Sequence, residues 1–304
     1  MQGHQGVRPV KSGDVVGALD IGGTHVSAGL VDVATASVDS GSRISEPLPA
    51  AGSRAELLAV ISRVTRSIAE PDIASLGVAV PGPFDYGRGV SQMTHKLDGL
   101  YGVDLRSELD AALARPDPTA IRFLNDAEAF LLGEWWAGAA RGHTRVVGVT
   151  LGTGLGSAFS EEGEIVRSGT RVPPGGELHR LRFRGAPVEQ TISRAALLAD
   201  YGTRPDEGID VEHLAGRALA GDQPARHVFT HLGTALGRFL TPWLQAFEPS
   251  CLVVGGSIAR SWALFEDSLR AEVQPIPAVG TVTVAEHLED AALLGAARHA
   301  SHRQ

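Results

Sequence analysis

Cysteine is almost absent from this sequence, which contains one, Cys251, among its 304 residues. A single cysteine forms no disulfide within the chain, and it cannot build a cysteine-based zinc site. The sequence also lacks any apolar run near the roughly 18 residues that a transmembrane helix requires. Its first residues lack the apolar stretch of a signal peptide. We therefore expect a protein of the reducing cytoplasm with no membrane partner.

Positive charge is also in short supply. Lys and Arg together number 27 against 35 Asp and Glu, so the formal net charge is -8. Proteins that bind nucleic acids or anionic membrane surfaces need an excess of positive charge, and we expect no nucleic-acid partner. Aromatic residues make up only 5% of the chain, so we expect a core built mostly from Val, Leu, Ile and Ala.

The sequence does contain an alternation of strand-like and helix-like segments. Apolar residues recur at helical spacing between residues 55 and 68, and again between 228 and 244, where Pro242 is expected to kink the helix. This alternation predicts the α/β fold class, and the length is sufficient for two domains. Strands are expected over 15–19, 75–80, 121–124 and 251–254, with a further helix opening at Ser261.

The opening of the chain returns near its middle. The segment 146–154, VVGVTLGTG, resembles VVGALDIGGT at 15–24, and the alignment places Asp20 opposite Thr150. A half-chain repeat of this kind indicates two related domains. Coincidence is the alternative, because short strings of Val and Gly are common.

Three glycine turns each follow an apolar strand directly. Glycine lets backbone N–H groups face a ligand without a Cβ in the way, and phosphate oxygens accept such hydrogen bonds. One turn alone is more often a tight hairpin, but three in two similar halves predict a nucleotide held between domains. None is a Walker loop, and none has the helix that a Rossmann fingerprint requires. The residues expected to bind the nucleotide are Gly22, Gly23, Thr24, Gly152, Thr153, Gly154, Gly255, Gly256 and Ser257.

Two aspartates stand at strand ends. Asp20 leads the first turn, where a carboxylate beside bound phosphate is expected to orient hydrated Mg²⁺; the alternative is an Asp that bonds its own turn. Asp126 stands where a strand passes into a helix, so it could accept the proton of a sugar hydroxyl during phosphoryl transfer. The alternative for Asp126 is a helix N-cap, which the local sequence by itself favours.

Two glutamates, Glu177 and Glu189, flank the polar stretch HRLRFRGAP. Paired carboxylates in a loop can bind sugar hydroxyls through charge-assisted hydrogen bonds. A solvated surface is an equally good interpretation of the two residues alone. The arginines between them, Arg180, Arg182 and Arg184, are expected to form a solvated or interface face.

Five motifs in this order resemble the ROK family of bacterial sugar kinases, from residue 15 to about 299. They are LDIGGTHVSAGLVD, GVAVPGPFD, LNDAEAFLLGE, GVTLGTGLGSAF and CLVVGGSIA. The resemblance implies the actin-like (ribonuclease H-like) fold, with two lobes and a cleft between them. It implies transfer of the γ-phosphate of ATP to the 6-hydroxyl of a glucose-type hexose. Mg²⁺ would be held through the nucleotide phosphates.

The resemblance also implies roles for single residues. Asp126 is implied as the general base, beside Asn125, which binds the sugar. GGELH at 175–179 and VEQTISRAAL at 188–197 resemble two further family segments, which implies Glu177 and Glu189 as sugar ligands. Gly82, in the turn of GVAVPGPFD, is assigned to the substrate side as well.

The resemblance implies a division of the chain into lobes. We expect a smaller N-terminal lobe over 1–124, with a flexible tail at 1–13, and a larger lobe over 125–287. A C-terminal helix in 288–304 is expected to pack back on the first lobe. We also expect a homo-oligomer, namely a dimer.

The departures from the family pattern concern its zinc site. The family uses a histidine and a CxCGxxGC cluster, whereas HRLRFRGAP contains no cysteine, so we expect no zinc. His179 lies one residue nearer Glu177 than the family histidine does, and it is expected to face either the sugar or the loop. The family's Asn-Leu-Pro-Gly-Trp segment is also altered, to KLDGL at 96–100.

Because of these departures, a kinase for an amino-glucose such as kanosamine is the rival to a glucose kinase. A sugar-responsive repressor is disfavoured, since only about a dozen residues precede the first phosphate strand and a helix-turn-helix domain would not fit there. A sugar-binding protein without catalysis is disfavoured by the presence of Asp20, Asn125 and Asp126.

Overall fold

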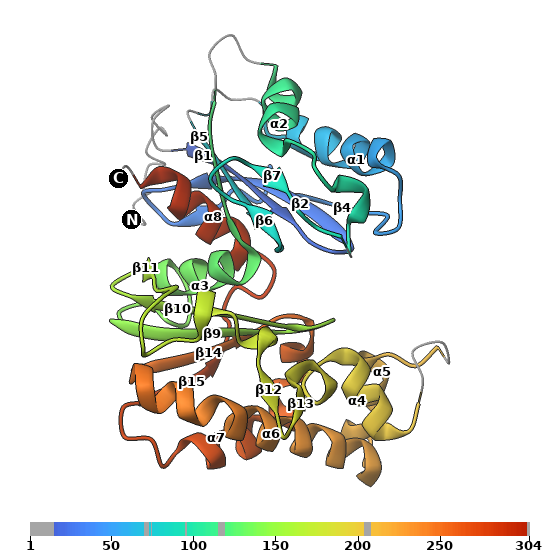
Figure 1. The fold of residues 1–304 in the computed structure, drawn as a ribbon, viewed down its shortest axis with the longest axis vertical. Coiled ribbons are helices and arrows are strands. Elements are labelled where there is room, and N and C mark those ends of the chain that lie inside the picture. Colours follow the sequence, from blue (N-terminus) through green and yellow to red (C-terminus); the bar gives the residue numbers. More distant parts are fainter. Residues whose placement is uncertain are drawn as a thin grey trace, which may run out of the picture. The chain divides into compact units, whose positions relative to one another are not determined.

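The computed structural model describes residues 15–69, 73, 75–94, 96–114, 119–203 and 208–302 (Figure 1). The tail expected at 1–13 lies outside the described residues. The chain folds into two compact units, which we call unit 1 (residues 1–129 and 292–304) and unit 2 (residues 130–291). The first unit therefore ends five residues beyond the lobe boundary expected at 124, and it includes most of the C-terminal helix.

Unit 1 contains a sheet in the order β3-β2-β1-β5-β8, with β4 paired to β2. Strands β1 and β2 form an antiparallel hairpin around the first glycine turn, whereas β5 and β8 run parallel to β1. The parallel strands therefore end at one edge of the sheet. The bounds are β1 (Val15–Ile21), β2 (His25–Asp32), β3 (Ser37–Val38), β4 (Ile44–Pro47), β5 (Ser75–Val80) and β8 (Ala120–Asn125).

Helices cover both faces of this sheet. On one face, α1 (Arg54–Arg66) and α2 (Leu105–Leu113) share a core with Leu76 and Val78 of β5. Gly77, between those two residues, faces the other side, because side chains alternate along a strand. A Cβ there would overlap the Ala296 carbonyl of α8 (Ala291–Ser301). Only glycine allows α8 this close approach to β5.

Smaller elements complete unit 1. A capping box starts α1, in which Ser53 and Glu56 bond each other's backbone N–H groups. The remaining elements are β6 (Phe84–Asp85), β7 (Val90–Ser91) and a 3-10 helix over Asp98–Leu100.

Unit 2 repeats the pattern of unit 1. Its sheet has the order β11-β10-β9-β14-β15, in which β9 and β10 form an antiparallel hairpin and β14 runs parallel to β9. A hairpin with a parallel neighbour therefore occurs in both units, as the similarity of segments 15–24 and 146–154 predicts. The bounds are β9 (Arg145–Leu151), β10 (Leu155–Glu161), β11 (Glu164–Ile165), β14 (Cys251–Gly255) and β15 (Thr281–Val284).

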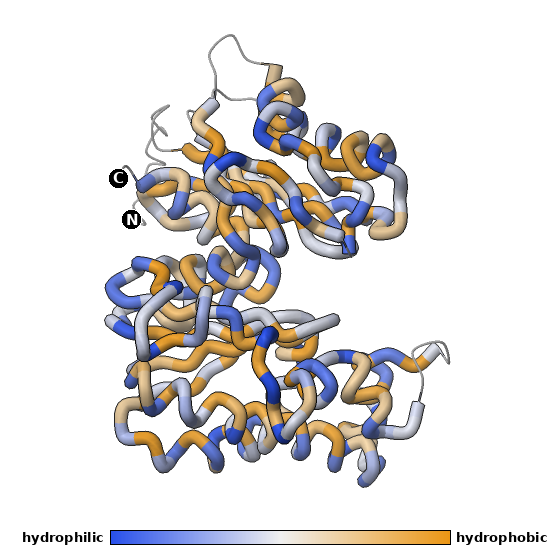
Figure 2. Tube along the Cα trace, viewed as in Figure 1, coloured by the Kyte–Doolittle hydropathy of each residue, from blue (hydrophilic) through white to orange (hydrophobic). Residues whose placement is uncertain are grey.

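The sheet of unit 2 also lies between helices. Val147 and Val149 of β9 share a core with four helices on one face. Gly148, between them, faces Leu131 of α3 on the other. Figure 2 shows hydrophobic residues concentrated along the strands. The helices are α3 (Asp126–Trp136), which begins in unit 1, and α4 (Arg194–Tyr201), α5 (Val211–Leu219), α6 (Gln223–Phe247) and α7 (Glu266–Val273).

Two helix predictions in unit 2 can be compared with the structure. The long helix expected around 228–244 is α6, and Pro242 lies inside it. The helix expected to open at Ser261 is wrong in its start. A 3-10 helix over Ser257–Leu264 follows β14, Ser261 has a non-helical backbone within it (φ -97°, ψ 24°), and α7 begins only at Glu266.

Across the described ranges, no helix has both the length and the apolar character that crossing a membrane requires.

Candidate functional site

Asn125 and Asp126 stand at the carboxyl edge of the sheet in unit 1. Asn125 is the last residue of β8, and it pairs with Val80, the last residue of the parallel strand β5. Asp126 is the first residue of α3. The carboxyl ends of parallel strands are where α/β proteins place their ligands, and the positive end of a helix favours an ionised carboxylate.

Asn125, and not Asp126, lies at the N-cap position of α3. Its Oδ1 accepts the N–H of Ala127 at 3.0 Å, although Oδ1 of Asp126 accepts the same N–H at 2.9 Å. The amide Nδ2 of Asn125 donates to the hydroxyl of Tyr86 at 3.2 Å, and that hydroxyl donates to the Val80 carbonyl at 3.3 Å. The Asn125 amide is therefore held from both ends.

Tyr86 is a site residue that was not predicted from the sequence. It follows the PGPF turn, and a Cβ built on Gly82 would lie 3.5 Å from its hydroxyl. Gly82 and Asn125 therefore both lie next to this hydroxyl. The available signal was a lone tyrosine beside the turn, in a chain with only three tyrosines.

Asp20 lies near the end of β1, where it pairs with Ala79 of β5. Burial and, second, the negative charge of Asp126 raise the pKa of Asp20 to about 7. Desolvation and a nearby like charge both disfavour the ionised form of a carboxyl group. A bound cation would lower this pKa again, so the position of Asp20 suits the orientation of Mg²⁺.

The first glycine turn is closed by its own backbone. The N–H of Gly22 donates to the carbonyl of His25 at 2.9 Å. A Cβ on Gly23 would meet nothing within 4 Å, and Gly23 and Thr24 are exposed. The turn leaves its backbone open to a ligand.

The second and third glycine turns lie side by side in unit 2. Strand β14 is the parallel neighbour of β9, with Gly255 paired to Thr150. A Cβ on Gly152 would lie 3.4 Å from Oγ of Ser257, and a Cβ on Gly256 (φ 83°) would overlap the backbone of Leu151. The sheet therefore brings together two motifs that are about a hundred residues apart in the sequence.

Glu189 contacts the second glycine turn. Its Oε1 accepts the backbone N–H of Leu155 at 2.9 Å. A Cβ on Gly154 would overlap this same oxygen. A carboxylate assigned to the sugar thus packs directly against a turn assigned to the nucleotide.

Glu177 is also paired. Its Oε2 lies 2.6 Å from Nε of Arg180, and the side chains are 35% and 64% exposed respectively. Arg180 is solvated, as expected, but its ion pair was not predicted. The feature of the sequence that could have predicted this ion pair is the i,i+3 spacing of Glu177 and Arg180, because a 3-10 helix brings residues at this spacing to one face. His179, between them, is exposed.

The loop in place of the family's zinc cluster is held by hydrogen bonds and packing. The buried hydroxyl of Ser157 donates to the Gly176 carbonyl at 2.6 Å and accepts the N–H of Leu178 at 2.9 Å. A short hairpin follows, formed by β12 (Arg182–Phe183) and β13 (Ala186–Pro187). The Phe183 ring packs edge-on against the Phe239 ring, with 5.6 Å between the ring centroids. Among the described residues, no group of three or more His, Cys, Asp or Glu side chains is placed to hold a metal ion.

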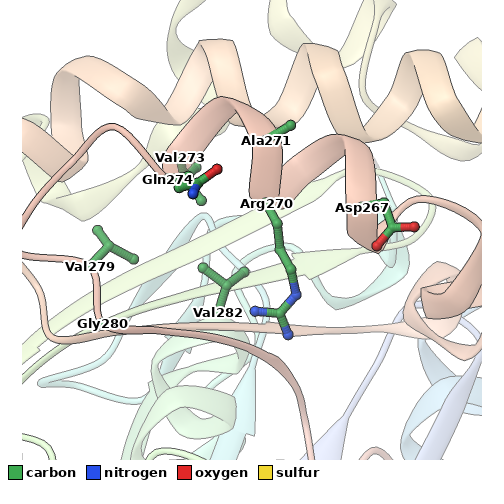
Figure 3. A pocket seen from close by; sticks show the side chains of 8 residues that line it. All are labelled: Asp267, Arg270, Ala271, Val273, Gln274, Val279, Gly280 and Val282. Carbon is green, nitrogen blue, oxygen red and sulfur yellow. The ribbon is translucent and has the colours of Figure 1, made fainter.

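A separate pocket of about 390 Å³ lies beside α7 and β15 (Figure 3). Asp267 and Arg270 of α7 line it together with Val282 of β15. It contains none of the residues that the motifs assign to a nucleotide or a sugar, so we do not assign the reaction to it.

Comparison with known proteins gives one consistent family. The model of the ROK family matches residues 16–303. A glucokinase from Thermotoga maritima is 28% identical over 310 residues, covering 92% of this chain and 95% of the glucokinase. A β-glucoside kinase from Listeria monocytogenes is 27% identical over 300 residues, covering 93% of this chain and 96% of that kinase.

Solved structures of this family have the same fold. The structure of a ROK family glucokinase from Streptomyces griseus, in complex with glucose and AMPPNP, superposes with a TM-score of 0.77. It is 24% identical, covering 94% of this chain and 99% of the other. The predicted actin-like fold is therefore confirmed.

Proposed function

The chain belongs to the ROK family, and from this premise we propose that it is an ATP-dependent hexose kinase acting on the 6-hydroxyl of a glucose-type sugar. The observation that carries the proposal is the pair Asn125–Asp126, at the carboxyl end of β8 and the start of α3. An acceptor for the hydroxyl proton stands there directly beside an amide held by Tyr86. The similarity to named sugar kinases supports the reaction class.

In the proposed reaction, Asp126 accepts the proton of the 6-hydroxyl as that oxygen bonds to the γ-phosphorus. The bond from the γ-phosphorus to the bridging oxygen breaks, and ADP leaves with the bond's electron pair. General-base catalysis of this kind contributes typically about 10²–10⁴-fold to the rate. Holding the hydroxyl in line with the phosphorus contributes as well, because phosphoryl transfer depends largely on positioning.

The same proposal gives roles to the other predicted residues. Asn125 and Gly82 would contact the sugar, and Glu177, Glu189 and His179 are assigned to the sugar as well. The three glycine turns would donate backbone N–H groups to the nucleotide. Asp20 would orient hydrated Mg²⁺, which supplies charge neutralisation at the β- and γ-phosphates when it is bound.

The test is a coupled assay with ATP and Mg²⁺ across a panel of hexoses and amino-hexoses. The proposal predicts phosphorylation of glucose or a close relative, with the phosphate on the 6-oxygen by phosphorus–proton NMR correlation. 6-Deoxyglucose is the matched control, since it keeps every other hydroxyl and should not react. The proposal fails if no sugar in the panel is phosphorylated, or if 6-deoxyglucose reacts as glucose does.

A further inference from the structure

The two carboxylates assigned to the sugar have different electrostatic partners. Oε2 of Glu177 lies 2.6 Å from the guanidinium of Arg180, which carries a permanent positive charge. Oε1 of Glu189 instead accepts a neutral backbone N–H, that of Leu155, at 2.9 Å. Glu177 is therefore paired with a cation of the protein, whereas the contact of Glu189 with Leu155 brings it no opposite charge.

The pair of Glu177 and Arg180 stands on a fixed segment. Gly175 and Gly176 both adopt left-handed backbone angles, with φ of 70° and 72°. Leu178, between the two charged residues, is buried, and its N–H is bonded by Ser157. A 3-10 helix follows over Leu178–Arg180, with Glu177 as the residue before it. Such a helix has three residues per turn, so residues 177 and 180 share one face. The backbone therefore presents the two side chains to each other.

The contact with Arg180 affects which hydrogen-bond donor of a sugar, a hydroxyl or an ammonium, Glu177 binds better. A carboxylate without a partner binds an ammonium more strongly than a hydroxyl, because the ammonium bond is charge-assisted. With Arg180 in contact, an ammonium on the sugar would be attracted by one charge and repelled by the other. A neutral hydroxyl keeps its hydrogen bond to the free lone pairs of the carboxylate and meets no repulsion.

We propose that Arg180 is a specificity-determining residue. Its ion pair with Glu177 makes that carboxylate a better ligand for a sugar hydroxyl than for an ammonium group at the same position of the sugar. The inference rests on the proposed function, because it takes Glu177 as a ligand of the phosphorylated sugar. It identifies the substrate class at Glu177 as a neutral hexose.

The experiment compares kcat/KM for glucose with kcat/KM for 2-amino-, 3-amino- and 4-amino-glucose. The enzymes are the parent, Arg180→Gln, Arg180→Lys and, as the matched control, Arg182→Gln. Arg182 lies two residues away and bonds the Gly185 carbonyl within the hairpin. The quantity compared is the ratio of each amino-sugar's kcat/KM to that of glucose.

The proposal predicts that Arg180→Gln raises this ratio about three- to fivefold for one of the three amino-sugars, the upper part of the range for removing an exposed charge partner. Arg180→Lys keeps the charge and should stay near the parent, as should Arg182→Gln. Isothermal calorimetry of glucose binding checks that Arg180→Gln is folded, and should it not fold, Arg180→Lys and Arg180→Met serve as the pair.

Ratios that stay within twofold in Arg180→Gln for all three amino-sugars would overturn the role of Arg180. An equal rise in Arg182→Gln would also overturn it, because the effect would then be general. Failure of the proposed function would give a different result, because the parent enzyme would then phosphorylate no hexose at all.

Discussion

The carboxyl groups of Asp20 and Asp126 are electrostatically coupled across the carboxyl edge of one sheet. Burial is the larger cause that raises the pKa of Asp20 to about 7, and the negative charge of Asp126 is the second. The two residues belong to β1 and to the start of α3, separated in the sheet by β5. A chain that gathers two repelling carboxylates at a strand edge gives up stability there, which is typical of a site for chemistry.

The pKa of Asp20 gives a prediction about stability and pH. An acid whose pKa is raised in the folded state does not lower the free energy of unfolding at pH values below its unfolded pKa, here 3.8. It lowers that free energy progressively as the pH rises from 3.8 to the folded pKa of about 7. Asp20→Asn cannot ionise. The free energy of unfolding of Asp20→Asn minus that of the parent should therefore increase by about 1–2 kcal/mol between pH 5 and pH 8. This is less than the full pKa shift implies, because Asp20 is partly exposed.

Urea denaturation at several pH values, without nucleotide or Mg²⁺, measures this difference. Asp267→Asn, at an exposed carboxylate on α7, controls for the general effect of the substitution. A difference between Asp20→Asn and the parent that does not grow with pH would contradict the electrostatics assigned to Asp20.

The loop around Glu177 should depend on one buried hydroxyl. Ser157→Ala removes the acceptor for the Leu178 N–H and the donor to the Gly176 carbonyl. Leaving such buried groups unpaired should cost about 1–3 kcal/mol of the free energy of unfolding. KM for the sugar should rise as well, because Glu177 adjoins Leu178.

A matched control lies on the same strand. Ser160 of β10 is fully buried, and its Oγ has no hydrogen-bond partner among the described residues. Ser160→Ala should therefore be neutral or stabilising by chemical denaturation. Equal losses in the two variants would show that the Ser157 bonds carry no special weight.

Gly154 should be intolerant of a methyl group for a functional reason. A Cβ there would overlap Oε1 of Glu189, so Gly154→Ala should displace the carboxylate and break its bond to Leu155. We expect kcat/KM for the sugar to fall about tenfold or more, as for the loss of a hydrogen bond to a charged group. Gly216→Ala in α5, where a Cβ meets nothing, should leave the kinetics unchanged and stabilise the helix slightly.

Zinc should be absent from the purified protein. The sequence has no cysteine in the stretch between Glu177 and Glu189, and the Ser157 bonds and the packing of Phe183 on Phe239 hold this part of the chain. Activity should withstand a zinc-selective chelator yet require Mg²⁺. Elemental analysis that finds about one zinc per chain would contradict this account of the loop.

Much of the fold could be predicted from local sequence. Glycine turns after apolar strands are encoded over a few residues, so Gly22, Gly152 and Gly255 were found with their strands. The start of α7 was not, because the backbone at Ser261 departs from helical geometry inside a 3-10 segment. Tertiary context rather than residue preference decides such a boundary.

Candidate site residues that belong to one local motif could be predicted from the sequence. Their hydrogen-bond partners from distant parts of the chain could not. Asn125 and Asp126 are adjacent and belong to one motif. Tyr86 reaches Asn125 only because β5 and β8 end together. Ser157 supports Leu178, which belongs to a 3-10 helix, from strand β10. Pairings of this kind depend on sheet register, which a single sequence does not reveal.

The central claim is that Asp126 is the general base, and rapid-quench measurement of phosphoryl transfer by Asp126→Asn tests it most directly. At saturating ATP and sugar, the account predicts a loss of at least about 10²-fold in kcat, while calorimetry finds sugar binding roughly retained. Retention of more than about a tenth of the parental kcat, far above what loss of a general base allows, would contradict the claim.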